Sequence, residues 1–315
     1  MPEIDRNAFL LITGSGGMLG SAVLAHLQRE GFTQLLAPTR QEMNLLDSNS
    51  IRAYLSAYRP KTIIHLASVV FGLGGNLKHQ MLSGLENTAI NNNLFRELQS
   101  YPIEHLFFAG TVASYPFPYR TMPLVEESFF EGLPHYGEFG YAMAKRHAYT
   151  YLRILGEETG LRYTYGIFTN LYGQNDRFDI ENSHVIPSLI AKAYSASQSG
   201  TVMEVWGDGS ALRDFLYAED AARAILLCLD QNDENRLINI SSGYGVSIRH
   251  IAETIATASG TTELRFVSDK PIGIPSRVVD NKQLTLLGFS PSVPIEEGLI
   301  NTYNWYSSNI KNIRR

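Results

Sequence analysis

The chain has 315 residues, enough for one large α/β unit or two lobes around a cleft. Its composition, 44% apolar and 18% charged, is that of a folded globular protein and excludes a disordered or collagen-like chain. The net charge of −5, with no basic run beyond the C-terminal KNIRR, argues against nucleic acid as a partner.

The N-terminus and the single cysteine indicate a cytoplasmic protein. The opening MPEIDRNAFLLITG is acidic before a short apolar run, unlike a signal peptide, and no apolar stretch approaches the length of a membrane span. Cys228 lies in the apolar run AILLCLD, so we expect a buried core thiol. We expect no membrane partner and assign no metal ligands.

Short apolar runs alternate with helical patterns through the first 170 residues. Runs that are nearly all apolar suit strands covered on both faces. Between the first two runs, Leu19, Val23 and Leu27 recur at helical spacing before Gly31 ends the helix. The alternation predicts an α/β fold with a doubly wound parallel sheet, a Rossmann domain. The predicted strands span 8–13, 34–39, 62–67, 105–111 and 162–170.

The sequence pattern changes after about residue 170, where loops rich in Asn, Asp and Gly begin. Further strands are predicted at 202–207 and 236–240, and a last helix from Pro294. We expect a smaller α/β substrate-binding lobe, with a cleft where it meets the strand ends. The predicted division is a Rossmann domain over 1–170 with a return segment near 215–240, and a lobe made of 171–214 and 241–315.

Three glycines stand three residues apart between the first predicted strand and its helix: Gly14, Gly17 and Gly20. A backbone without side chains can approach a pyrophosphate closely, while the N-terminus of the helix faces its charge. The pattern in this setting predicts a dinucleotide site.

The residue after the second strand indicates which dinucleotide binds. An acidic side chain there would hold a ribose hydroxyl, and a basic one would accept a 2′-phosphate. Arg40 directly follows the predicted strand, and Glu42 comes two residues later. A planar guanidinium suits a phosphate, so Arg40 favours NADP. The alternative is a solvated loop arginine.

Tyr141 and Lys145 are four residues apart, on one face of a helix that follows the fourth strand. A free tyrosine titrates near pH 10, too high for efficient proton transfer at neutral pH. We expect the Lys145 ammonium to lower the tyrosine pKa by stabilising the phenolate. Thr111 and Ser114, at the end of the fourth strand, offer hydroxyls to a substrate carbonyl. The alternative is an ordinary helix face.

These motifs resemble the extended short-chain dehydrogenase/reductase superfamily. More closely, and nearly end to end, the chain is similar to the GDP-L-fucose synthases, which act on GDP-4-keto-6-deoxymannose. NSHVIP and the WG…RDF segment are more specific to this branch than the glycine loop and YxxxK. The segments that carry the resemblance are GSGGMLGSAV near the start, RQEMNLLDS at 40–48, YAMAK at 141–145, TNLYGQND at 169–176, NSHVIPSLI at 182–190, VWGDGSALRDFLY at 205–217 and KPIGIPSR at 270–277.

The resemblance implies a reductase centre, NADPH as cofactor and a GDP-linked 4-keto-6-deoxy sugar as substrate. It also implies a homodimer through helices near 86–100 and 141–156. The implied catalytic residues are Thr111, Tyr141, Lys145 and His184. Cofactor contacts are implied for Gly14, Gly17, Met18, Leu19, Gly20, Arg40, Leu66, Ala67, Tyr141, Lys145, Phe168, Asn170, Leu171 and His184. Substrate contacts are implied for Ser114, Asn170, Val185, Lys192, Trp206, Arg213 and Lys270, although Trp206 could also be plain core.

The chain departs from the family at two positions. The family has a cysteine two residues after the catalytic hydroxyl, which partners the histidine of SHVIP in inverting sugar C3 and C5; here that position is Ala113, while His184 remains. Inversion beside a ketone needs a proton-transfer group on each face, and a methyl group cannot serve. An unassisted Ser114 would be a poor base. Gly16 replaces the usual arginine of the glycine loop, so NADPH preference rests more on Arg40.

We therefore predict an NADPH-dependent C4-ketoreductase of a GDP-4-keto-6-deoxy sugar, hexose or heptose, without C3/C5 epimerase activity. The main alternative is a bifunctional GDP-L-fucose synthase that uses another acid. A 4-epimerase would need an acidic residue after the second strand, and a 4,6-dehydratase a carboxylate pair that TVAS lacks. A non-catalytic NADP-binding protein is the alternative from another class.

Overall fold

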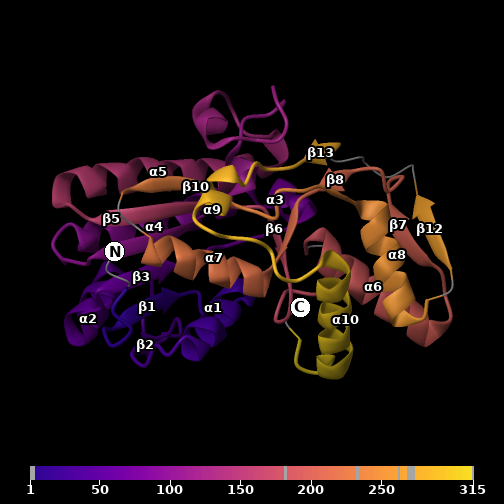
Figure 1. The fold of residues 1–315 in the computed structure, drawn as a ribbon, viewed down its shortest axis with the longest axis horizontal. Helices are drawn as coiled ribbons and strands as arrows, with labels where there is room; N and C mark the ends of the chain where they lie inside the picture. The colour runs from indigo at the N-terminus through magenta and orange to yellow at the C-terminus, as the bar shows by residue number, and fades with distance from the viewer. Residues whose placement is uncertain (1–3, 181–182, 232–233, 262, 268–273, 314–315) are drawn as a thin grey trace.

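The computed structural model describes residues 4–180, 183–231, 234–261, 263–267 and 274–313. Six parallel strands form the central sheet in the order β10-β5-β4-β3-β1-β2 (Figure 1). The predicted doubly wound α/β fold is confirmed. The strands are β1 (Leu10–Thr13), β2 (Leu35–Leu36), β3 (Thr62–His65), β4 (His105–Thr111), β5 (Arg162–Phe168) and β10 (Arg236–Ile240).

Side chains alternate between the two faces of the sheet, and helices bury both. Leu10 and Ile12 pack with α1 and α7, whereas Leu11 packs with α2, α4 and α5. Because each face has its own apolar cluster, the strands are nearly all apolar. The helices are α1 (Met18–Arg29) and α7 (Ala218–Asp230) on one face, and α2 (Ser48–Tyr58), α4 (Gln80–Leu98) and α5 (Phe139–Thr159) on the other.

A smaller lobe packs three helices around a core of its own, beside the carboxyl ends of the sheet strands (Figure 1). Its strands are short and form small sheets. The helices are α6 (Val185–Ser199), α8 (Ile248–Ser259) and α10 (Ile295–Asn309). The strands are β6 (Asn170–Tyr172) with β9 (Phe215–Tyr217), β7 (Met203–Trp206) with β12 (Leu264–Val267), and β8 (Leu212–Arg213) between β11 (Val246–Ser247) and β13 (Ser276–Arg277).

The predicted strands agree with the structure to different extents. The run 105–111 is β4 throughout, whereas 34–39 shortens to the two residues of β2. Pro38 lacks a backbone N–H and ends the pairing of this edge strand. The return segment contributes α7 and β10 to the Rossmann domain, while the exact division into domains stays a prediction. Cys228 is fully buried in α7, as expected.

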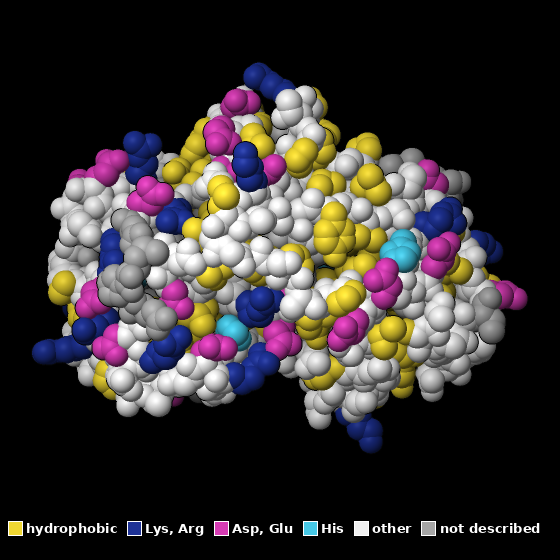
Figure 2. All heavy atoms as spheres, in the orientation of Figure 1, with side chains coloured by type: hydrophobic (Ala, Val, Ile, Leu, Met, Phe, Trp, Pro, Cys, Tyr) yellow, Lys and Arg dark blue, Asp and Glu magenta, His cyan; other side chains and the backbone are white. Residues whose placement is uncertain are grey.

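Charged side chains of both signs are interspersed on the face shown in Figure 2. In the described part of the chain, no helix combines the length and apolar character that a membrane span requires. The described residues also contain no cluster of three or more His, Cys, Asp or Glu side chains placed to hold a metal ion.

Candidate active site

The glycine loop passes too close to its neighbours for side chains. Gly14 has φ +74, and a Cβ there would lie 2.7 Å from the backbone nitrogen of Ala67. Gly20 in the first turn of α1 would collide with the Gly14 carbonyl, and Gly17 is the N-cap residue of α1. Glycine at these positions therefore lets the loop pack closely against its neighbours before α1, and the pyrophosphate contact at the N-terminus of α1 stays a prediction.

A buried hydrogen-bond network fixes the strand end beside the glycine loop. The His65 imidazole bonds to the Thr13 hydroxyl over 2.8 Å and to the Asn91 amide oxygen over 3.1 Å. Burial lowers the His65 pKa to about 3, so the ring is neutral and can donate to Asn91 while it accepts from Thr13. Thr13 in turn accepts from the Ala67 N–H over 3.3 Å, which holds 66–67 against the loop.

Arg40 is exposed just beyond β2. The nearby acid, Glu42, is folded back on Thr39, because its carboxylate accepts from the Thr39 backbone N–H over 2.7 Å and from its hydroxyl over 2.9 Å. The carboxylate is thus engaged as a local cap, and Arg40 is the first charged side chain after β2. This arrangement supports the preference for a 2′-phosphate.

Three of the four predicted catalytic residues, Thr111, Tyr141 and Lys145, lie close together. Tyr141 lies in the first turn of α5, with its hydroxyl near the side chains of Thr111 and Ser68. Lys145 follows one turn later, is 1% exposed, and donates from Nζ to the Ala109 carbonyl over 2.8 Å. Its Nζ lies 5.8 Å from the centre of the Tyr141 ring. Strand β4 and helix α5 therefore bring a phenol, an ammonium and a hydroxyl together.

The expected lowering of the Tyr141 pKa by Lys145 is wrong for this structure. Burial raises the Tyr141 pKa to about 12, and Glu138 adds to the rise. Lys145 directs its Nζ to a backbone carbonyl, and burial lowers its own pKa to about 7. The phenol is therefore protonated at neutral pH, which is the state that donates a proton during a reduction.

Ala113 is buried in the 3-10 turn Val112–Ser114, and no proton-transfer group replaces its methyl at that position. His184 is the N-cap residue of α6 but makes no side-chain capping bond. Its removal from solvent by the surrounding protein lowers its pKa, although Glu138 opposes that shift. The structure thus brings His184 within electrostatic reach of a carboxylate that the sequence analysis does not include.

Glu138 belongs to a buried ion pair that joins the two lobes. Arg277 on β13 donates to both oxygens of Glu138 and, from Nε, to the Tyr119 hydroxyl over 2.7 Å. Burial alone would raise the Glu138 pKa, but the Arg277 charge and hydrogen bonds lower it overall. Glu138 stands directly before α5, so the pair ties the lobe to the helix of Tyr141.

Three of the predicted substrate residues gather in the lobe. Arg213 on β8 lies beside Arg277, and burial together with that charge lowers the Arg213 pKa to about 10. The Lys192 Nζ lies 4.8 Å from the centre of the Trp206 ring. Trp206 is 53% exposed, so the alternative of a plain core residue is wrong. Lys270 lies outside the described residues.

The side chain of Ser114 does not face a substrate site. It is fully buried and donates to the Ala142 carbonyl over 3.2 Å, which corrects the predicted substrate contact. Asn170 donates from its side chain to the Asp214 carbonyl over 2.9 Å. Phe168 is buried at the end of β5. The remaining predicted contacts are half-buried along the glycine loop, β6 and the start of α6: Met18, Leu19, Leu171 and Val185.

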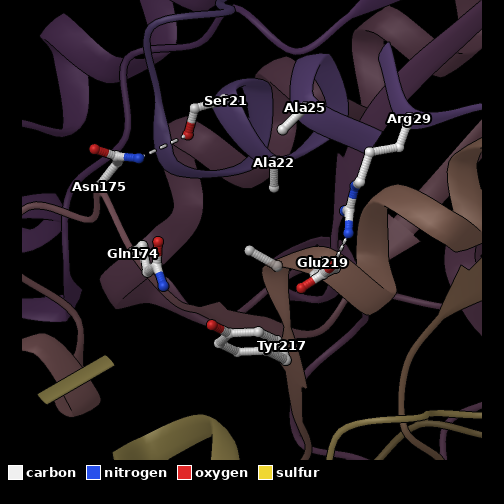
Figure 3. A pocket seen from close by; sticks show the side chains of 9 residues that line it. Ser21, Ala22, Ala25, Arg29, Gln174, Asn175, Tyr217 and Glu219 are labelled. Atoms are coloured by element: carbon white, nitrogen blue, oxygen red, sulfur yellow. Dashed lines mark hydrogen bonds and ion pairs between the residues drawn. The ribbon is translucent and has the colours of Figure 1, made fainter. Parts of the chain in front are cut away.

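A cavity of about 160 Å³ lies between α1 and the start of α7 (Figure 3). An Arg29–Glu219 ion pair of 2.6 Å forms one side, and Asn175 donates to the Ser21 hydroxyl on another. Its lining includes none of the predicted site residues in the described part of the chain. The chemistry therefore belongs to the cluster around Tyr141 and not to this cavity.

The sequence analysis missed Ser68 and Glu138. Ser68 follows β3, and groups beyond the carboxyl ends of parallel strands often line the site, so that rule could have indicated it. Glu138 precedes Tyr141 by three residues, but its role depends on Arg277, which is distant in sequence. No local pattern predicts that pair.

Comparisons with known proteins identify the family of this chain. The model of the NAD dependent epimerase/dehydratase family matches residues 10–241. GDP-L-fucose synthase 1 of Arabidopsis thaliana is 32% identical over 98% of this chain and 96% of its own length. GDP-L-colitose synthase of Yersinia pseudotuberculosis is 32% identical over 96% and 99%, respectively.

A solved structure gives the same result. A GDP-L-fucose synthetase from Naegleria fowleri bound to NADP superposes with a TM-score of 0.91, 29% identity and coverage of 100% of this chain and 97% of that one. With its glycine loop, its Tyr141–Lys145 pair and this similarity over nearly its whole length, the chain belongs to the NAD dependent epimerase/dehydratase family, among the homologues of the GDP-L-fucose synthases.

Proposed function

We propose that this protein is an NADPH-dependent C4-ketoreductase of a GDP-linked 4-keto-6-deoxy sugar, hexose or heptose, without C3/C5 epimerase activity. The observation that carries the proposal is the cluster of Tyr141, Thr111 and Lys145 beside a buried Ala113. At the coarser level, family membership makes the chain an oxidoreductase that uses NADP, in agreement with the sequence prediction.

The residues present fit the cofactor. Gly14 and Gly20 have no room for a Cβ beside the Ala67 and Gly14 backbones, so the glycine loop packs closely before α1, at whose N-terminus a pyrophosphate would bind. Arg40 is an exposed cation that would hold the 2′-phosphate. NADPH, when bound, supplies the hydride for the sugar C4. Lys145 lies one turn from Tyr141, where it would also hold the nicotinamide ribose.

The protein's own groups manage the proton. Tyr141 is protonated at neutral pH and would donate its hydrogen to the oxygen that becomes negative at C4. Thr111 would hydrogen-bond the same oxygen. Because the site is buried, fixed donors around that oxygen should act strongly on the developing charge.

The geometry favours reduction without epimerisation. His184 would need a partner on the opposite face of the sugar, and Ala113 offers a methyl there. Glu138 is a carboxylate within electrostatic range of His184, but Arg277 donates to both of its oxygens, and the pKa of Glu138 is lowered. A carboxylate in that state is a weak base and carries no proton to return. The bifunctional synthase thus remains the second candidate.

The substrate class is supported by the lobe. Arg213 is a half-buried cation that fits a diphosphate, and the exposed Trp206 with Lys192 offers a face for a base or ribose. NADPH oxidation with a panel of GDP-4-keto-6-deoxy sugars, with and without prior C3/C5 epimerisation, tests the proposal. NADPH oxidation with members of the panel would support the proposal. A lack of NADPH oxidation with every member would contradict it.

Arg40→Ala should raise the KM for NADPH roughly 10- to 100-fold, because a charge-assisted contact to phosphate contributes about 1.5–3 kcal/mol. Steady-state kinetics with both cofactors measure the effect. NADH lacks the 2′-phosphate and is the internal control, so its KM should stay the same. Equal losses for both cofactors would place Arg40 outside the phosphate site.

The kcat/KM for NADPH should fall as pH rises through about 7, because Lys145 is charged below its lowered pKa and neutral above it. Lys145→Arg keeps the charge across this range and should remove the fall. The measurement is a pH profile from about 6 to 9 for both proteins. If kcat/KM still fell through pH 7 in the variant, the fall would belong to a titrating group other than Lys145.

Two further expectations stay predictions. A homodimer through α4 and α5 would cover exposed apolar side chains such as Met81, Leu85, Tyr151 and Ile154. We also keep the cytoplasmic location predicted from the sequence.

A further inference from the structure

The first turn of α5 lacks a capping bond from its own N-cap residue. The first four N–H groups of an α-helix have no partner inside the helix, and the N-cap side chain usually accepts from one of them. Glu138 is the N-cap residue of α5, but its side chain makes no capping bond. Its carboxylate instead accepts from Arg277 on β13. The N–H groups at the start of α5 therefore need an acceptor from elsewhere in the fold.

Gln80, the first residue of α4, supplies such an acceptor. Its side-chain oxygen accepts from the Gly140 N–H over 2.7 Å, and its side-chain nitrogen donates to the Tyr136 carbonyl over 2.5 Å. An amide nitrogen cannot accept and a carbonyl cannot donate, so both bonds form in only one orientation of the side chain. Gln80 thus joins the 3-10 turn Tyr136–Glu138 to the first turn of α5. We call Gln80, Tyr136 and Gly140 the α5 clamp.

Close packing of the two helix starts makes the α5 clamp possible. A Cβ at Gly140 would collide with the backbone carbonyl of Gln80. One turn further along α4, a Cβ at Gly84 would lie 3.5 Å from the Gly140 carbonyl oxygen. Gln80 itself is half-buried in this contact. Because glycine at position 140 lets the backbones approach, the Gln80 side chain is short enough to bond on both sides of the N-cap residue.

The α5 clamp lies directly beside the predicted proton donor, since Tyr141 is the next residue after Gly140. The second turn of α5 is held by other bonds. Lys145 donates from Nζ to the Ala109 carbonyl of β4 over 2.8 Å, and its own carbonyl accepts from the Tyr165 hydroxyl of β5 over 3.0 Å. The two turns are therefore anchored separately, and the bonds to the first turn set the direction of Tyr141.

We propose that Gln80 is a positioning residue that orients the first turn of α5 and thereby places the Tyr141 hydroxyl. That this hydroxyl is used in ketone reduction rests on the proposed function, whereas the α5 clamp does not. Misplacing a catalytic group by about 1 Å can cost up to about 100-fold in rate. Gln80 is outside the predicted cofactor contacts, so its loss should change kcat and leave the KM for NADPH as it is.

Gln80→Met tests the proposal, because it keeps the length of the side chain and loses both hydrogen bonds. With the full chain, NADPH and a GDP-4-keto-6-deoxy sugar, kcat should fall roughly 10-fold. Gln80→Glu keeps an oxygen for the Gly140 N–H, and a negative charge is favourable at the N-terminus of a helix. It should therefore retain most of the turnover. An unchanged kcat in Gln80→Met would overturn the proposal.

Gln231→Met is the matched control. Gln231 is a half-buried glutamine directly after α7, and its side chain donates to the Leu287 carbonyl over 2.9 Å. The change removes a hydrogen bond of the same kind on the other face of the sheet from α5, so kcat should stay the same. A loss of kcat equal to that of Gln80→Met would show a general effect of stability and would also overturn the proposal.

Hydrogen–deuterium exchange with mass spectrometry separates the α5 clamp from the reaction. In Gln80→Met the Gly140 N–H loses its acceptor, so peptides that cover 138–145 should exchange roughly 3- to 10-fold faster. In Gln80→Glu and Gln231→Met these peptides should exchange as in the natural chain. Unchanged exchange in Gln80→Met would refute the α5 clamp. Faster exchange in a protein that oxidises no NADPH with GDP-4-keto sugars would refute the proposed function and keep the α5 clamp.

Discussion

Tyr141→Phe should lower the turnover of a GDP-4-keto sugar by about 10²–10⁴-fold, the usual contribution of a positioned proton donor. The variant keeps the ring and its packing but loses the hydrogen that the phenol carries at neutral pH. NADPH binding should persist, because the glycine loop and Arg40 are untouched. Stopped-flow hydride transfer and cofactor titration separate the two effects.

Tyr149→Phe is the matched control for that experiment. Tyr149 is half-buried on the same helix, two turns after Tyr141, and packs against Phe130 and Tyr165. Its loss should leave turnover nearly unchanged. If Tyr141→Phe also retained turnover, the protein would be a non-catalytic NADP-binding protein or use another donor.

Arg277→Met should destabilise the protein by about 3–5 kcal/mol, because it leaves the Glu138 carboxylate buried without its partner. Arg277→Met combined with Glu138→Gln removes both charges and should recover much of the loss. Urea unfolding measures the three proteins, the natural chain included. Equal stability of the single and double variants would show that the pair is not coupled.

The same pair sets a pH dependence. The Glu138 pKa is lowered from 4.5 in the folded protein, so its contribution to stability is present above the unfolded value and is lost as pH falls through the folded one. The stability gap between the natural chain and Arg277→Met should therefore narrow below about pH 4.5. A gap that is constant into acid would assign the loss to packing.

Local sequence patterns predict the Rossmann sheet and the nearness of Tyr141 to Lys145, while the catalytic roles of these residues stay a prediction. Strand β4 and helix α5 place Thr111, Tyr141 and Lys145 through rules that involve only spacing and strand ends. The sign of the Tyr141 pKa shift was wrong, because burial and the direction of Lys145 are properties of the folded chain. The predicted substrate contact of Ser114 was wrong for the same reason, since its hydroxyl donates to the Ala142 carbonyl.

The sequence could not predict the residue pairs that join distant segments. Glu138 and Arg277 are 139 residues apart, and the ion pair exists only because the lobe folds back over the start of α5. Ser68 meets Tyr141 through the order of β3 and β4 in the sheet. Contacts of this kind can be identified only from the tertiary structure, because no periodic pattern in the sequence indicates them.

Reduction in D₂O addresses the central claim most directly. A GDP-4-keto-6-deoxy sugar made in ordinary water is reduced with NADPH, and the product is examined by mass spectrometry and NMR against substrate held in D₂O without enzyme. The account predicts a product with no deuterium on C3 or C5 beyond that control, because Ala113 leaves His184 without a proton-transfer partner. Enzyme-dependent deuterium at either carbon would contradict it and identify a bifunctional epimerase and reductase.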